Sequence, residues 1–134
     1  SKEIKKNFYN IGHKNKWPKF PPTSCMCFEK KTLKEVLKKI EFKRFPNLGI
    51  DFRLAVYYSI ILNKFYIHKS HLTYYRQVEE SMDSKYVKYR SIEWWKRREE
   101  AFEFLNFVLK KNKLPINKGL DFFVTKLFNN ILNI

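Results

Sequence analysis

Between Asp51 and Leu62 the chain carries leucine, alanine, valine, tyrosine and isoleucine without a continuous polar face. A helix that is hydrophobic around its whole girth has to be buried by other elements. The breaker sequence Phe45-Pro46-Asn47-Leu48-Gly49 comes directly before it. We therefore expect a buried helix that begins at Asp51, ends near Leu62 and needs amphipathic neighbours to cover it.

Three other segments have the periodicity of such neighbours. Apolar residues recur every three or four positions in residues 31–42. They do so again along a long segment that begins between Lys85 and Ser91 and ends at Lys111. The third segment, residues 120–134, has an apolar stripe of Leu120, Phe123, Val124, Leu127, Ile131 and Ile134. Phe122 and Phe128 lie beside that stripe. This last helix is therefore expected to contact two partners, or a partner that is absent.

The remaining segments predict a small β component. Residues 23–28, 65–67 and 72–77 are short and apolar and lie between turn-forming or charged residues, as in short strands, and residues 78–84 predict a polar loop. We expect residues 1–22 to be an irregular basic approach segment, residues 23–84 a strand-helix-helix-strand unit, and residues 85–134 a helical hairpin. The predicted fold class is mainly α with a small β component.

Composition excludes several classes of protein. With 44% hydrophobic and 18% aromatic residues the chain can bury a core, so wholesale disorder is excluded. No window approaches the roughly 18 uninterrupted apolar residues of a membrane span, and no leader of the secretory type precedes the first helix. The only two cysteines, Cys25 and Cys27, are too few for a disulfide framework or a four-ligand zinc site. We expect a protein of the reducing cytoplasm.

The formal net charge of +15 comes mostly from lysine and is concentrated in the first fifty residues. Lysine, asparagine and isoleucine are all abundant, as in proteins from AT-rich genomes, so the charge alone is weak support for a polyanionic partner. Residues 86–98 interleave aromatic and basic side chains, as a nucleic-acid stacking platform does. Glutamates at positions 93, 99, 100 and 103 dilute the positive field there, and we favour an ordinary amphipathic helix over a nucleic-acid-binding module.

Four short motifs occur in an order that resembles a known family. They are Pro21-Pro22-Thr23-Ser24-Cys25, Phe28-Glu29-Lys30-Lys31-Thr32-Leu33, Ile50-Asp51-Phe52-Arg53-Leu54-Ala55 and Leu72-Thr73-Tyr74-Tyr75-Arg76-Gln77. Their order and spacing resemble the C-terminal part of bacterial family 2 glycosyltransferases, especially sugar transferases of surface-polysaccharide or lipooligosaccharide synthesis. The resemblance covers about residues 17–77. It implies that the chain is the C-terminal portion of a GT-A-like α/β enzyme.

The resemblance also implies residue roles. Asp51 would be the catalytic base, although the family often has an acidic pair where this chain has Ile50-Asp51. Arg53, Tyr75, Arg76 and Gln77 would bind substrate, with Arg76 best suited to the donor pyrophosphate. The Mn or Mg ion would be held by an Asp-Xaa-Asp outside this chain, which contains no such motif. The chain has no initiating methionine, so we expect a piece of a longer enzyme that is inactive alone.

The resemblance implies two substrates, a nucleotide-sugar donor and a glycan or lipid-linked acceptor. The basic surface suits peripheral contact with the inner face of the cytoplasmic membrane. A different hypothesis is that the chain is an interaction or membrane-docking domain that acts, or self-associates, through residues 120–134.

Overall fold

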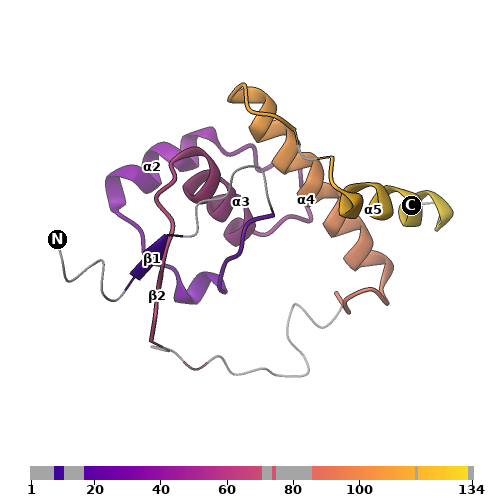
Figure 1. Cartoon of the computed structure of the whole chain (residues 1–134), viewed down its shortest axis with the longest axis horizontal. Helices are drawn as coiled ribbons and strands as arrows, with labels where there is room; N and C mark the ends of the chain where they lie inside the picture. The colour runs from indigo at the N-terminus through magenta and orange to yellow at the C-terminus, as the bar shows by residue number, and fades with distance from the viewer. Residues whose placement is uncertain (1–7, 11–16, 71–73, 75–85, 117, 133–134) are drawn as a thin grey trace. The chain divides into compact units, whose positions relative to one another are not determined.

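The computed structural model describes residues 8–10, 17–70, 74, 86–116 and 118–132. The chain divides into two compact units, the first formed by residues 1–41 and 49–74 and the second by residues 42–48 and 75–134. Helices dominate the described part of both units (Figure 1), which confirms the mainly α class. The boundary predicted at residues 84–85 lies outside the described residues.

In the first unit, α3 (Ile50–Val56) and the π-helical segment η2 (Tyr57–Ile61) form one continuous buried helix. Every residue from Phe52 to Ser59 is buried, as the sequence predicted. The helix ends in a wide turn, in which the amide of Leu62 donates to the carbonyl of Tyr57 at 2.9 Å. Asn63 then takes a left-handed conformation with φ of 50°, which asparagine tolerates better than most residues. Helix and turn together confirm the predicted element at residues 51–62.

Aromatic rings cover this buried helix. The rings of Trp17 and Phe20 lie 4.9 and 5.7 Å from the ring of Phe52, measured between centroids. At the other end, the rings of Phe28 and Tyr58 are 5.0 Å apart. These tilted and edge-on contacts are the arrangement that aromatic pairs prefer. They attach the segment before α2 to both ends of the central helix.

The helix α2 (Lys30–Lys39) provides the amphipathic neighbour predicted at residues 31–42. It buries Val36, and Ile40 is buried directly after its last turn. The Tyr57 hydroxyl donates to the carbonyl of Lys39 at 3.1 Å. This hydrogen bond satisfies a carbonyl at the end of α2, where no intrahelical donor is available.

The small β component differs from the prediction in two places. The strand β1 (Phe8–Asn10) pairs antiparallel with β2 (Tyr66–His68), so the segment predicted to be irregular contains a strand. The strand predicted at residues 23–28 is wrong, because this segment begins with a 3₁₀ turn, η1 (Thr23–Cys25). Two prolines precede this turn, and the Pro22 carbonyl accepts from the amide of Cys25 at 2.9 Å. The extended piece at 72–77 and the loop at 78–84 fall outside the described residues, except for Tyr74.

The second unit contains α4 (Ile92–Lys111) and α5 (Leu120–Ile131), the predicted hairpin helices. Ser91 caps α4 by accepting the amide of Trp94 at 3.1 Å. Seven residues of α4 are buried: Trp95, Ala101, Phe102, Phe104, Leu105, Val108 and Leu109. Residues 42–48 pack against this helix, where the Asn47 side chain donates to the Glu100 carboxylate at 2.7 Å. Within the described segments, no helix is long and apolar enough to cross a lipid bilayer.

Candidate functional site

Asp51 lies in the first turn of α3, one residue after the helix begins. Gly49 is the N-cap residue, so Asp51 is not the cap itself. Its Oδ1 accepts the amide of Phe52 at 2.8 Å, which satisfies one of the free amides of the first turn. The side chain is half-buried, whereas the eight residues after it are buried. The carboxylate is therefore oriented by the backbone and still reachable from solvent.

Arg53 has a structural role in this fold. Its residue is only 2% exposed, and its Nη1 donates to the carbonyl of Glu41 at 2.9 Å. This bond joins α3 to the chain that follows α2. A guanidinium enclosed in this way cannot contact a ligand unless the turn around Glu41 moves. The position of Arg53 therefore favours a structural role over the predicted contact with substrate.

The other predicted site residues, Tyr75, Arg76 and Gln77, lie outside the described residues. Of the two cysteines, Cys25 is half-buried and Cys27 is exposed. In the segments that the structure describes, no three histidine, cysteine, aspartate or glutamate residues gather closely enough to hold a metal ion.

The aromatic and basic side chains of residues 86–98 contact one another. The Arg97 guanidinium lies 4.6 Å from the centre of the Tyr86 ring, and that of Arg98 lies 5.1 Å from the Trp94 ring. Trp94 also packs on Trp95, with 4.8 Å between the ring centroids. Cations that already cover aromatic faces compete with any base that would stack there. This arrangement favours the amphipathic-helix interpretation over the stacking platform.

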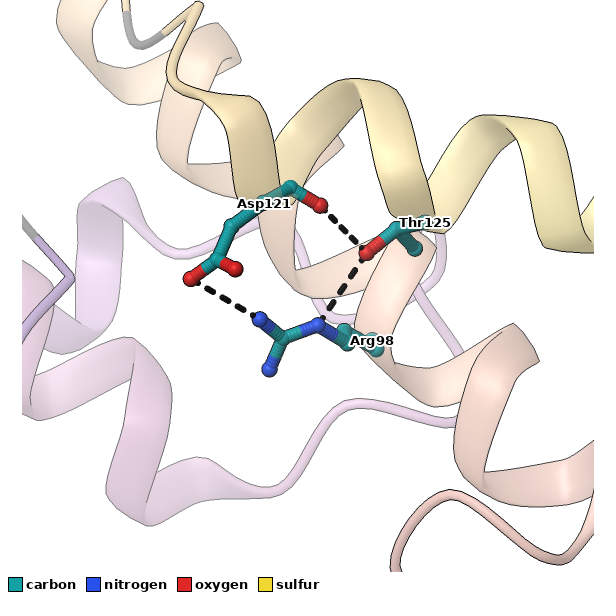
Figure 2. Close-up of polar contacts among 3 residues, drawn as sticks. All are labelled: Arg98, Asp121 and Thr125. Carbon is teal, nitrogen blue, oxygen red and sulfur yellow. Dashed lines mark hydrogen bonds and ion pairs between the residues drawn. The ribbon is translucent and has the colours of Figure 1, made fainter.

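Both aromatic rings and polar side chains make the contact between α4 and α5. Trp95 of α4 stacks on Phe128 of α5 with 4.5 Å between the ring centroids, and the rings of Phe102 and Phe122 meet edge-on at 5.7 Å. Figure 2 shows the polar part of the contact. Arg98 of α4 forms an ion pair with Asp121 of α5 at 3.2 Å and donates through Nε to the Thr125 hydroxyl at 3.1 Å. The Thr125 hydroxyl in turn donates to the carbonyl of Asp121 at 2.7 Å. The spacing of Asp121 and Thr125 places them on one face of α5, one turn apart. One arginine thus contacts two successive turns of the opposite helix.

Asn129 continues the same line of contacts one turn further along α5. Its Nδ2 donates to the carbonyl of Trp95 at 3.3 Å and to the carboxylate of Glu99. Thr125 and Asn129 are each only 1% exposed, and they are the buried residues of α5. We call the contacts of Arg98, Asp121, Thr125, Asn129 and Glu99 the polar seam.

Because the polar seam lies against α4, the apolar stripe of α5 lies on the outside. We call this surface the outer face of α5; it consists of Leu120, Phe123, Val124, Leu127 and Ile131, all of which are exposed. Leu120 is 84% exposed and Ile131 64%. Sequence reasoning identified the stripe but not its orientation. The signal that indicates it is the spacing of Asp121, Thr125 and Asn129, opposite an arginine in α4.

Comparison with known proteins does not identify the chain: no protein-family model, no curated protein and no solved structure matches it.

Proposed function

We propose that this chain forms the acceptor side of a family 2-like glycosyltransferase, which moves a sugar from a nucleotide-sugar donor to an acceptor hydroxyl. The observation that carries the proposal is the position of Asp51. Its carboxylate is held by the Phe52 amide and stays half-exposed at the start of an otherwise buried helix. The order of the four sequence motifs is a second, independent support.

The chemistry requires a carboxylate that can take a proton at a fixed position. In an inverting transfer, the base accepts the proton of the acceptor hydroxyl while that oxygen bonds to the anomeric carbon. The bond from the anomeric carbon to the donor breaks, and the nucleoside diphosphate leaves with the bonding electrons. A positioned general base contributes about 10²–10⁴-fold to such a step. Asp51 meets the need for positioning because the backbone already restricts its side chain.

The rest of the proposed site comes from the sequence. We assign contact with the donor pyrophosphate to Tyr75, Arg76 and Gln77, because the fork of an arginine can hold two phosphate oxygens at once. Arg53 is left out because it is buried. We assign the metal ion to residues beyond this chain.

The test is Asp51→Asn in the complete polypeptide that contains this sequence. Asparagine keeps an oxygen that can accept the Phe52 amide, so the start of α3 is preserved while the base is removed. We expect kcat for release of the nucleoside diphosphate to fall at least about 10²-fold, with donor affinity unchanged. Glu35→Gln is the matched control, because Glu35 is an exposed acid on α2 that pairs with Lys38. Unchanged turnover in Asp51→Asn would leave the carboxylate with a helix-stabilising role only.

A further inference from the structure

We propose that the outer face of α5, together with the lysines that precede it, docks this chain onto an anionic lipid surface. The inference does not rest on the proposed enzymatic function. It follows from the orientation of α5 and from the charge of the segment between α4 and α5.

The first argument is the orientation of α5. The polar seam uses the side of the helix that carries Asp121, Thr125 and Asn129. The exposed stripe runs along the opposite side for the whole length of the helix, which is about 18 Å at 1.5 Å per residue. A helix with one side held against a neighbouring helix and a leucine-rich side exposed has the form that lies in the plane of a membrane interface.

The second argument is charge. The connector between the helices, residues 112–119, and the last turn of α4 carry Lys110, Lys111, Lys113 and Lys118, all exposed. No acidic residue occurs between Glu103 and Asp121, and Asp121 is engaged by Arg98. Each lysine close to an anionic leaflet strengthens binding by about fivefold.

The connector also exposes apolar side chains. Leu114 and Ile116 are exposed between these lysines, at 37% and 44%. On α5 itself the basic residue is Lys126, which is exposed beside the outer face. Apolar side chains flanked by lysines match a surface that offers acyl chains below anionic headgroups.

Charge also decides between lipid and a second copy of this chain. Two copies that met through the outer face of α5 would bring the lysines of both chains together, in molecules that each carry a net charge of +15. Such self-repulsion opposes association. An anionic leaflet attracts the same lysines, so the lipid surface is the occupant that fits both the apolar and the charged residues.

The test is co-sedimentation of the chain with vesicles of phosphatidylcholine, alone or with about 30 mol% phosphatidylserine. We expect binding to the anionic vesicles and at least about tenfold weaker binding to the neutral ones. Binding should weaken as salt rises from about 0.1 M to about 1 M, because the Debye length falls from about 10 Å to about 3 Å. Absence of binding to the anionic vesicles, or equal binding to both kinds, overturns the proposal.

Two pairs of variants separate the apolar and the charged contributions. Leu127→Gln with Ile131→Gln should weaken vesicle binding at least about tenfold, since both side chains would leave the acyl region. Val87→Gln is the control, an exposed apolar residue before α4. Lys110→Gln with Lys118→Gln should weaken binding to anionic vesicles by about twenty-five-fold. Lys31→Gln with Lys34→Gln, on exposed positions of α2, is its control.

The oligomeric state provides the decisive alternative outcome. Light scattering should give one molar mass across protein concentrations for the wild type and for Leu127→Gln. A concentration-dependent increase in mass that Leu127→Gln abolishes would assign the outer face of α5 to a second copy and overturn the lipid proposal. Equal loss of vesicle binding in each variant and its control would overturn it as well.

Discussion

Replacing the Thr125 hydroxyl with a methyl group tests whether α5 packs through the polar seam. Thr125→Val keeps the shape and volume of the side chain. It removes two hydrogen bonds, the one that the hydroxyl accepts from Arg98 Nε at 3.1 Å and the one that it donates to the Asp121 carbonyl at 2.7 Å. The Thr125 residue is 1% exposed, so water cannot replace its hydroxyl without opening the contact between the helices.

The expected cost follows from these two bonds. A neutral hydrogen bond contributes about 0.5–1.5 kcal/mol and one to a charged group about 1.5–3 kcal/mol. Arg98 keeps its ion pair with Asp121, and its side chain is 19% exposed, so solvent recovers part of the loss. We therefore expect Thr125→Val to lower the free energy of unfolding by about 1–2 kcal/mol.

Urea unfolding followed by tryptophan fluorescence measures this change, because Trp94 and Trp95 lie in α4. Thr32→Val is the matched control. Its hydroxyl donates to Glu29 in an exposed position, and its loss should cost no more than about 0.5 kcal/mol. Leu127→Gln should also stay within about 0.5 kcal/mol, because Leu127 is exposed. If Leu127→Gln costs over about 2 kcal/mol while Thr125→Val costs nothing, the apolar stripe packs inward and the polar seam is wrong.

Two further predictions concern the tyrosines of the buried helix. Tyr58→Phe should be neutral or stabilising, because the buried Tyr58 hydroxyl has no hydrogen-bond partner among the described residues. Tyr57→Phe should lower the free energy of unfolding by about 1 kcal/mol, because it removes the hydrogen bond to the Lys39 carbonyl. Thermal unfolding of the two variants checks the difference. Burial, and secondarily the carboxylate of Glu29, raises the pKa of Tyr58 above its ordinary 10.0, and burial likewise raises the pKa of Tyr57. Because the folded state then retains these protons longer than the unfolded state, the free energy of unfolding should be maintained up to pH 10.0 and fall above it. Ultraviolet titration should show late-ionising tyrosines that shift to the ordinary range in urea, and a stability that rises with pH in this range would contradict the reasoning.

The buried helix could be predicted from sequence because its signal is local. Residues 51–62 are apolar on all sides and follow a proline and a glycine. In the structure α3 begins directly after Gly49, and α3 and η2 together form the buried helix. The widening of the last turns could not be predicted. It depends on how Leu62 and Lys64 bond back to Tyr57 and Tyr58, which a hydrophobic pattern does not encode.

The strand predicted at residues 23–28 illustrates the limit of short apolar patterns. Between Thr23 and Phe28 the side chains suit either a strand or a turn. The preceding Pro21 and Pro22 favour the turn, because proline presets φ and cannot donate to a ladder. The strand β1 was not predicted, because its partner β2 lies more than fifty residues away in the chain and pairing at that distance leaves no local signal.

For the candidate site, sequence placed Asp51 at the start of a buried helix and the structure agrees. The sequence could not show that Arg53 is buried, because a charged residue in an apolar helix can bind either a ligand or a buried carbonyl. The carbonyl of Glu41 decides between them, and it belongs to a different element. Whether Asp51 acts as a base stays a prediction.

The polar seam has a consequence for how the hairpin responds to its surroundings. Apolar packing loses its driving force when a helix pair moves from water into hydrocarbon, whereas ion pairs and hydrogen bonds strengthen as the local dielectric constant falls. The Asp121 side chain is 79% exposed, so its ion pair with Arg98 stays in contact with water while only the opposite, outer face of α5 is covered. A hairpin that lies on a surface through its outer face would therefore keep the polar seam wet and unchanged, whereas one that sinks deep enough to surround α5 would have its ion pair strengthened and would become more rigid.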